Sequence, residues 1–335
     1  MSNHHRVRVQ DAFNSRLCKT EILNKYRDGY MVEIYALNIR GEDRTIYKVF
    51  TNEGTFLLKT TSYFTSNRAV KDKIEEELKI TDQYKIDENR KIVSNFLKLK
   101  DRKDHIDELT HKTTIEVLYE FGEQTLQSKL EEMSISERIE AMKKLLIPME
   151  VLEQNEVIHG ALRPENVIIE HEKCLVADFG VKFDFFNEER MNSVMDSVMC
   201  KMVDEMDIYA PPELFQGDRN YPTKIDIYVW GMCLYQLITD MTDDVMKQKI
   251  TLRSNQRTYQ QFLNEIKNLR LTNKGVDVQL QKWVKSVLLR VLSYHPEKRP
   301  NFRVIKNEAN MNTLLYKTEI SQYKRVVKDN GNVLG

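Results

Sequence analysis

Cysteine, net charge and long apolar runs are all scarce in this sequence. Its 335 residues include four cysteines, and none lies in a C-x-x-C pair or a Cys/His cluster with metal-ligand spacing. Acidic and basic side chains number 51 each, so no global field attracts nucleic acid or an anionic membrane. No stretch approaches about 18 consecutive apolar residues, which excludes an evident membrane-spanning helix. The composition predicts a globular protein that binds neither nucleic acid nor membrane.

The N-terminal segment, MSNHHRVRVQDAFNSRL, has no apolar core of the signal-peptide type. Scattered thiols suit a reducing compartment, so we expect a cytoplasmic protein. Hydrophobic residues at 41% and charged residues at 30% are ordinary for a soluble domain. The length is enough for one large domain or two small ones.

Strand-like patterning dominates the sequence before Gly122. The segments MVEIYALNI, TIYKVFT and TFLLKTT are separated by the turn residues RGEDR and NEG, which predicts a three-stranded antiparallel meander. A charged stretch follows with Val70, Ile74, Leu78 and Thr81 at helical spacing. Two more strands are predicted in KIVSNFLKLK and TTIEVLYEF, and the charged segment DRKDHIDELTHK between them is expected to be a solvated hairpin tip.

Helical patterning dominates the sequence after Gly122. The segment SISERIEAMKKLLIPMEVLEQ keeps one apolar face and begins with a cap at Ser134 or Ser136. DIYVWGMCLYQLIT is apolar nearly all round, which is typical of a buried helix. TYQQFLNEIKNLR, VDVQLQKWVKSVLLRVLSY and VIKNEANMNTLLYKTEISQYKRVV are amphipathic, so the second part of the chain is predicted to be mainly α-helical.

Six short segments, in a fixed order, resemble the motifs of eukaryotic-type protein kinases. They are FLLK ending at Lys59, HGALRPEN from His159 to Asn166, VADFG with Asp178, YAPPE ending at Glu213, DIYVWG from Asp226, and HPEKRP with Arg299. A single DFG would be weak evidence, but all six in order over a sheet-then-helix chain are specific. The resemblance covers roughly residues 30 to 315.

The resemblance implies an α+β, bilobal protein-kinase-like fold. Residues 29–121 would form the small antiparallel-sheet lobe with one main helix, and residues 122–315 the larger helical lobe. Residues 1–28 would be an N-terminal extension, which packs on the domain or docks a partner. Residues 316–335 would hold the end of the last helix and a tail.

The family positions imply roles for several residues. Lys59 corresponds to the lysine that holds the nucleotide phosphates, and a glutamate of the predicted helix would pair with it. Glu77, eighteen residues later, fits that partner, and Glu76 fits nearly as well. Asn166 and Asp178 keep oxygen ligands suited to magnesium, although each could also persist for structural reasons.

The catalytic loop departs from the family pattern at its centre. In HGALRPEN, which begins at His159, the family aspartate is replaced by Ala161, whose methyl group neither accepts a proton nor orients a hydroxyl. The preceding arginine has become Gly160, which removes a reader of activation-segment phosphate. Arg163 replaces the loop lysine, so its charge is kept but its hydrogen-bond geometry changes. The loop therefore resembles that of a pseudokinase.

The nucleotide-facing positions are altered as well. Only Gly41 remains where the family has a glycine-rich loop, and Glu42 and Asp43 place negative charge near it. Leu57 replaces the small alanine that packs over adenine, and either fills that space or displaces the ring. Tyr119 occupies the gatekeeper position and narrows the pocket behind it. ATP and magnesium binding are left open by these residues.

The structural frame is better kept than the chemistry, since Glu213 and Arg299 can form the family's buried ion pair. We interpret the chain as a pseudokinase that acts as a protein-binding scaffold, an allosteric regulator or a component of an assembly. Candidate contact surfaces are the N-terminal extension, the segment from Asp101 to Lys112 and the tail KRVVKDNGNVLG. The alternatives are a divergent ATP-dependent transferase and a nucleotide sensor that does not hydrolyse ATP.

Overall fold

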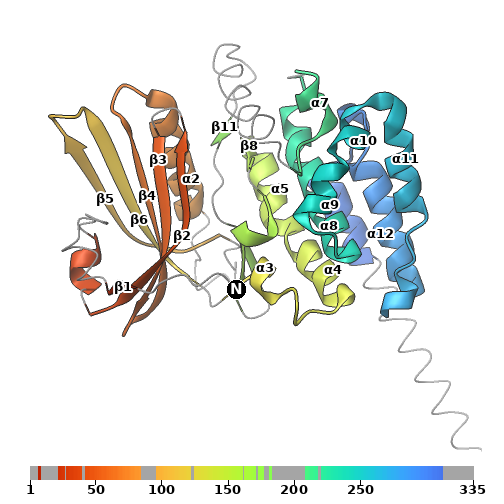
Figure 1. The fold of residues 1–335 in the computed structure, drawn as a ribbon, viewed down its shortest axis with the longest axis horizontal. Helices are drawn as coiled ribbons and strands as arrows, with labels where there is room; N and C mark the ends of the chain where they lie inside the picture. The colour runs from red at the N-terminus through yellow and green to blue at the C-terminus, as the bar shows by residue number, and fades with distance from the viewer. Residues whose placement is uncertain are drawn as a thin grey trace, which may run out of the picture. The chain divides into compact units, whose positions relative to one another are not determined.

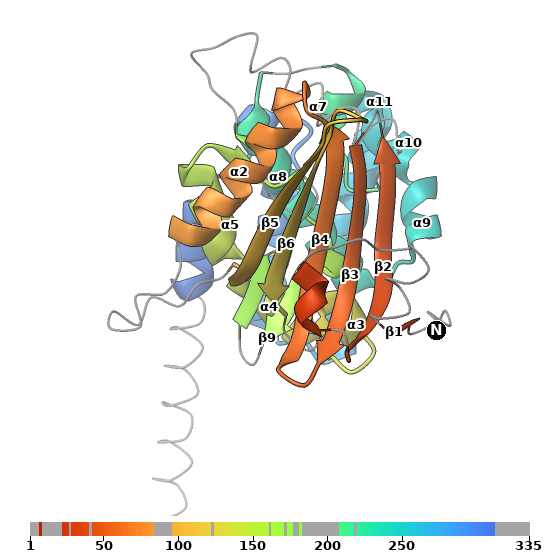
Figure 2. The same ribbon diagram turned by 90° about the vertical axis from the view of Figure 1, so that its left-hand side faces the viewer.

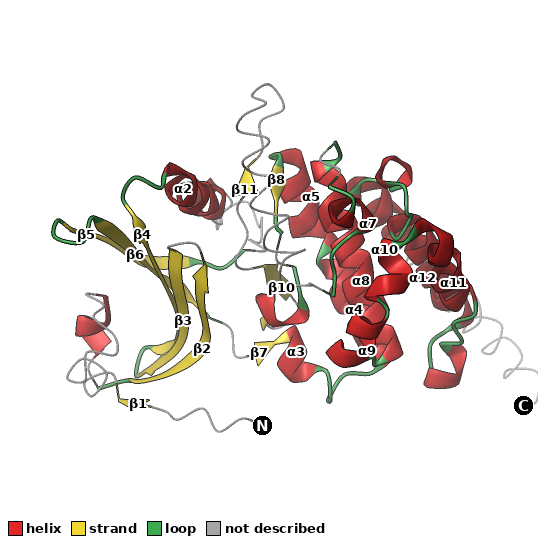
Figure 3. Ribbon diagram, turned by 45° about the horizontal axis from the view of Figure 1, so that its top comes forward, coloured by secondary structure: helices red, strands yellow, loops and turns green. Residues whose placement is uncertain are grey.

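The computed structural model describes residues 7–8, 22–26, 28–39, 42–83, 96–121, 124–160, 162–170, 173–176, 181–182, 208–217 and 220–311. The chain divides into two compact units, one of residues 1–126 with 165–181 and one of residues 127–164 with 182–335. Strands dominate the first, which we call the sheet unit, and helices dominate the second, the helical unit (Figure 3), so the predicted α+β class is confirmed. Among these described residues, no helix has the length and apolar character needed to cross a membrane.

The sheet unit is built around one large sheet, with one long helix and one short helix packed on it (Figure 1). Its elements are β1 (Val7–Arg8), η1 (Ile22–Tyr26), β2 (Tyr30–Ile39), β3 (Glu42–Thr51), β4 (Gly54–Phe64), α2 (Arg68–Gln83), β5 (Leu99–Asp107), β6 (Lys112–Glu120), β7 (Gln124–Thr125), β9 (Val167–Glu170) and β10 (Lys173–Val176). Three short elements cross the division between the units: α3 (Leu126–Lys129), η3 (Pro164–Asn166) and β11 (Val181–Lys182).

The large sheet is antiparallel throughout, with the strand order β1-β2-β3-β4-β6-β5 (Figure 2). The meander predicted for β2, β3 and β4 is therefore confirmed. β7, β9 and β10 form a smaller sheet in the order β10-β9-β7. Gly54 opens β4 after a tight turn with a φ of 140°, a backbone conformation that a residue with a Cβ atom rarely adopts.

The prediction that residues 101–112 form a hairpin tip is wrong. Most of that segment is strand β5, which pairs with β6 from Leu99 opposite Tyr119 to Asp107 opposite Lys112. Only residues 108–111 form the turn. β5 is the edge strand of the sheet, so many of its side chains stay in water, and charged residues are typical of an edge that must not pair with another chain. Because the residues of β5 are mostly charged, the hydrophobic pattern of the sequence did not indicate a strand there.

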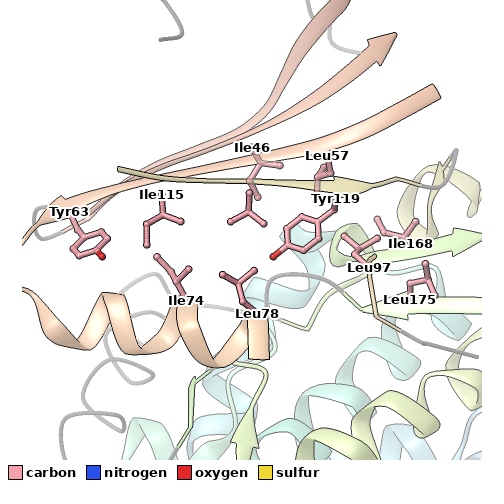
Figure 4. Packing of buried hydrophobic residues seen from close by; sticks show 11 residues of the cluster. Ile46, Leu57, Tyr63, Ile74, Leu78, Leu97, Ile115, Tyr119, Ile168 and Leu175 are labelled. Atoms are coloured by element: carbon pink, nitrogen blue, oxygen red, sulfur yellow. The ribbon is translucent and has the colours of Figure 1, made fainter. Parts of the chain in front are cut away.

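Helix α2, whose existence the helical spacing predicted, covers one face of the large sheet. Ile74 and Leu78 are buried there at 4% and 5% exposure, and Val70 packs beside them. Figure 4 shows the cluster that they join with the sheet and the β9–β10 hairpin: Ile46, Leu57, Tyr63, Ile74, Leu78, Leu97, Ile115, Val117, Tyr119, Ile168 and Leu175. Odd-numbered residues of β4 face this side, because successive side chains of a strand alternate between faces.

The short helix η1 covers the opposite face of the sheet (Figure 1). Its apolar residues join a second cluster, which consists of Ile22, Leu23, Tyr26, Met31, Val49, Phe56, Leu58 and Leu118. The backbone N–H of Ile22 donates to the buried carboxylate of Glu116 at 3.1 Å, and Lys25 donates to Asp101 at 2.8 Å. The last part of the predicted extension is therefore packed against the sheet.

The helical unit holds a run of short and medium helices (Figure 1). Its elements are α4 (Ile135–Lys144), α5 (Leu146–Gln154), β8 (Val157–Ile158), α7 (Pro212–Phe215), η5 (Pro222–Lys224), α8 (Ile225–Thr239), α9 (Asp243–Gln248), α10 (Ile250–Ser254), α11 (Gln256–Lys267), η6 (Thr272–Lys274), α12 (Val278–Val291) and η7 (Pro296–Lys298), followed by a helical segment over 302–311.

The helix predicted over 134–154 is two helices. Ser134 caps α4, because its hydroxyl accepts from the N–H of Glu137 while the Glu137 carboxylate accepts from the N–H of Ser134. The break at Leu145 follows from Pro148, which has no N–H to donate to the carbonyl four residues earlier. Proline is tolerated in a first turn, so α5 starts just before it.

Helix α8 is the centre of the helical unit, and the prediction of a buried helix is confirmed. Trp230 is fully buried and donates its indole N–H to the carbonyl of Met142 at 3.0 Å. Gly231 lies against α12, where an added Cβ would come within 2.5 Å of Val291. Glycine is therefore required for the close approach of α8 to this part of the chain. Trp283 on α12 is also buried, so both tryptophans belong to the core.

Candidate functional site

The predicted phosphate-holding lysine lies inside the sheet unit. Lys59 stands on β4 between Ile46 of β3 and Val117 of β6, and only 4% of it is exposed. Its odd number places its side chain on the face that α2 covers, together with Leu57 and Tyr63. A lysine is rarely this buried without an anionic partner, so its position is more than that of a solvated strand residue.

Among the three consecutive glutamates of α2, the structure describes the side chain of Glu75. Glu75 is held by Arg102 of β5, with contacts of 2.6 and 3.1 Å between the guanidinium and the carboxylate. The Arg102 guanidinium holds the pKa of the Glu75 carboxyl below its usual value. Glu77 and Glu76 lie on α2, but their side chains are outside the described residues, so the choice between them stays a prediction.

The two residues expected to line the adenine site lie side by side. Leu57 of β4 is directly opposite Tyr119 of β6, and they are 6% and 3% exposed. Both belong to the cluster that continues onto Ile168 and Leu175 of the β9–β10 hairpin (Figure 4). Apolar side chains thus occupy the sheet face beside Lys59 in the sheet unit.

The start of the loop HGALRPEN is anchored in the helical unit. The backbone N–H groups of His159 and Gly160 donate to the two carboxylate oxygens of Asp226 at 2.6 and 3.1 Å. Burial raises the pKa of Asp226 to about 6, although both N–H bonds oppose that shift. Gly160 has a φ of 67°, a left-handed conformation that glycine adopts without a Cβ penalty.

A later residue of the loop, Arg163, also has a contact in the helical unit. The guanidinium carbon of Arg163 lies 5.8 Å from the ring centroid of Tyr209, a cation–π contact within the helical unit. The buried Tyr209 donates its hydroxyl to Gln236 on α8. Asn166 ends the short helix η3, directly before β9. Sequence reasoning missed Tyr209 as a support for the loop, because the segment YAPPE that it begins does not indicate a contact with HGALRPEN.

Three predicted site residues, Gly41, Ala161 and Asp178, lie outside the described residues. The structure therefore does not test their side-chain positions. Within the described part of the chain, no group of three or more His, Cys, Asp or Glu side chains could hold a metal ion. The magnesium role expected for Asn166 with Asp178 stays a prediction.

The buried ion pair expected between Glu213 and Arg299 is present. The two guanidinium Nη atoms donate to the two carboxylate oxygens at 2.5 and 2.7 Å. Both residues are nearly inaccessible, at 4% and 2% exposure. Arg299 also lies over the ring of Tyr228 at 4.8 Å and donates to the carbonyls of Ser293 and Lys224. The pair joins α7 to the segment that follows η7.

Comparisons with known proteins agree with the resemblance to protein kinases that the six motifs indicated. A family model described as the protein kinase domain matches residues 40–311. CTD kinase subunit alpha from Saccharomyces cerevisiae is 29% identical over 129 residues, which cover 37% of this chain and 23% of that protein. Probable cyclin-dependent kinase 9 from Caenorhabditis elegans is 31% identical over 99 residues, which cover 29% of this chain and 20% of that protein. This chain therefore matches less than a quarter of the length of either relative.

A solved structure extends the comparison to the fold. MAP kinase LmaMPK10 from Leishmania major matches with a TM-score of 0.52 at 12% identity, and the match covers 89% of this chain and 86% of that one. Identity this low supports the arrangement of elements alone. The bilobal kinase-like fold predicted from the six motifs is confirmed.

Proposed function

We propose that this chain, which belongs to the protein kinase domain family, is a pseudokinase that has lost phosphoryl transfer and acts by binding another protein. One observation carries the proposal. The start of the catalytic loop is anchored by Asp226, whose carboxylate accepts from the backbone N–H groups of His159 and Gly160. The residue that follows Gly160 in this anchored loop is Ala161, where the family has its aspartate.

An alanine at this position removes the group that orients the substrate hydroxyl and accepts its proton. General-base catalysis typically contributes about 10²–10⁴ in rate, or roughly 3–5 kcal/mol of barrier. The sequence HGALRPEN contains one acidic residue, Glu165, and its family counterpart is structural. The contact of Arg163 with Tyr209 supports the interpretation that Arg163 positions the loop.

The sheet unit supports weakened nucleotide binding. Leu57 and Tyr119 pack into one apolar cluster with Ile168 and Leu175, on the face where adenine is expected. An adenine ring would have to displace part of that packing, and well-packed interiors resist such changes. Lys59 keeps a cation at the position that holds the phosphates in the family, and this residue is what supports residual binding of ATP with magnesium.

Protein binding is the activity that remains for such a fold. The balanced charge gives no reason to expect nucleic acid, and the two named relatives are a kinase subunit and a cyclin-dependent kinase. Those names describe proteins that work with a second chain. We infer that this chain also has a protein partner, and we expect it in the cytoplasm because of its scattered thiols.

A transfer assay tests the proposal. The full chain is incubated with radiolabelled ATP, magnesium and a general protein substrate, beside the matched variant Asp178→Asn. We expect no transfer above the level of the variant. Metal-dependent transfer by the wild type that Asp178→Asn abolishes would refute the loss of catalysis and favour the divergent transferase.

A nucleotide sensor is the second candidate, and the buried position of Lys59 favours it. Thermal unfolding with millimolar ATP, with and without magnesium, separates it from the scaffold. An increase in melting temperature that Lys59→Met removes would support the sensor, and no change would exclude it. Ala161→Asp adds a further comparison, because transfer gained by that variant would mean that only the base is missing.

A further inference from the structure

The guanidinium of Arg102 forms salt bridges with two carboxylates, one on helix α2 and one on the edge strand β5. We call this pair of salt bridges the fork. Its Nη1 and Nη2 atoms donate to the two carboxylate oxygens of Glu75 at 3.1 and 2.6 Å. Its Nε and Nη2 atoms donate to the two oxygens of Asp104 at 2.8 and 2.7 Å. One guanidinium therefore bridges a carboxylate of α2 and a carboxylate of β5. Bidentate pairs of this kind fix direction as well as distance.

Strand geometry explains why these groups meet. Arg102 and Asp104 are two residues apart on β5, so their side chains leave the same face of the sheet. Arg102 lies opposite Val117, whose other neighbour is Lys59, and this row faces α2. The edge position leaves room for a long side chain to reach along the sheet to the helix.

The electrostatics of the fork favour its ionised state. Hydrogen bonding to Arg102 lowers the pKa of Glu75 despite partial burial. The two carboxylates raise the pKa of Arg102, so its charge is kept at any ordinary pH. The side chains of Arg102, Glu75 and Asp104 are 28%, 44% and 45% exposed, which leaves the fork sensitive to salt.

The apolar contacts of α2 that the structure describes are of a different kind. Ile74 and Leu78 are buried against the sheet, and Val70 packs beside them. Apolar contacts hold a helix on a sheet but define its rotation and sliding less sharply, because they are not directional. The fork to Glu75 adds the directional contact that these residues lack.

We propose that Arg102 is the positioning residue of helix α2. It fixes the helix against β5 through Glu75, within the sheet unit and without a nucleotide or a partner. α2 also carries Glu76 and Glu77, the residues expected to face Lys59, so the fork sets the place from which either could act. The inference goes beyond the proposed function and holds whether or not the chain transfers phosphate.

Hydrogen exchange of backbone amides tests the proposal in the full chain without nucleotide. Arg102→Met removes the fork, and Lys103→Met is the matched control, because Lys103 is exposed and leaves the other face of β5. We expect exchange in residues 68–83 to become about tenfold faster in Arg102→Met, with β4, β6 and the helical unit unchanged. Lys103→Met should exchange as the wild type does.

Two further measurements separate positioning from general stability. Arg102→Lys keeps the charge but not the planar fork, so α2 should still exchange faster than in the wild type. The reversed pair Glu75→Arg with Arg102→Glu should restore slow exchange, because a guanidinium on α2 can then pair with the carboxylate introduced on β5 and with Asp104. Unchanged exchange of α2 in Arg102→Met, or an equal increase in every element, would overturn the proposal. If Arg102→Met does not fold, Arg102→Lys gives the same decision.

Discussion

Arg253 offers a sharp test of how charge is buried in the helical unit. It lies on α10 with 1% exposure, and none of its Nε, Nη1 and Nη2 atoms has a hydrogen-bond partner among the described residues. Its charge acts on Tyr235 and Tyr259, opposing the rise in pKa that burial gives both phenols. The carboxylate of Glu265 near Tyr235 already accepts from Lys249 at 2.5 Å.

A guanidinium that is buried without hydrogen-bond partners destabilises the fold. The effective penalty for taking an ion out of water is several kcal/mol in real proteins, and replacing even a buried ion pair by apolar side chains of similar volume is often neutral or stabilising by about 1–4 kcal/mol. We therefore expect Arg253→Met to raise the free energy of unfolding by about 1–4 kcal/mol.

Arg299→Met is the matched control with the opposite sign. Arg299 is buried to the same degree, but both of its Nη atoms are paired with Glu213. Its loss leaves an uncompensated buried carboxylate, which costs about 3–5 kcal/mol. The same substitution should therefore stabilise the protein at one site and destabilise it at the other.

Urea unfolding followed by tryptophan fluorescence measures both variants. The chain has two tryptophans, Trp230 on α8 and Trp283 on α12, so the signal reports the helical unit. With an m-value of about 2 kcal/mol/M, the midpoint should rise by roughly 0.5–2 M for Arg253→Met. A midpoint lowered by that substitution would refute the reasoning, because it would mean that Arg253 has a stabilising partner in the folded protein.

Three other substitutions test single contacts. Gly231→Ala should destabilise the helical unit by about 1–3 kcal/mol in the same urea assay, although alanine favours helix, because its methyl would overlap Val291. Glu116→Gln should weaken the bond to the N–H of Ile22 and speed proteolysis within residues 22–26, while sheet amides keep their exchange rates. The raised pKa of Asp226 means that its folded state binds a proton more tightly than the unfolded chain, so its contribution is full below about pH 4 and lost as pH rises to about 6. The stability of the wild type relative to Asp226→Asn should therefore fall by up to about 3 kcal/mol between pH 4 and pH 6, and a flat difference would contradict the assigned burial.

Motifs predicted the frame of the site well where each residue has one fixed partner. Glu213 and Arg299 were expected to pair because both stand in family motifs, and the structure places them in contact. Asp226 begins the family segment DIYVWG, and its carboxylate accepts from the backbone of HGALRPEN. Such contacts can be predicted because a motif encodes both ends of the interaction.

Contacts with one end outside a motif could not be predicted. The fork between Arg102 and Glu75 was missed because the charges of β5 were interpreted as a solvated tip. The contact of Arg163 with Tyr209 was missed for a different reason: both residues stand in motifs, but neither motif indicates that these two side chains meet. The break before Pro148, in contrast, could have been predicted from the sequence, because proline cannot donate a backbone hydrogen bond inside a helix.

The short helix η1 has a practical consequence for any study of the N-terminal segment. Ile22 and Leu23 close over Val49, Leu58 and Leu118, and all five side chains are fully shielded from water. A chain shortened to begin at Gly29 would expose that apolar sheet face to water, and exposed patches of this kind drive self-association. Loss of partner binding after such a truncation would then report aggregation as readily as a lost docking site. Replacing Lys25 or other exposed residues of the segment one at a time keeps the face covered and separates the two effects.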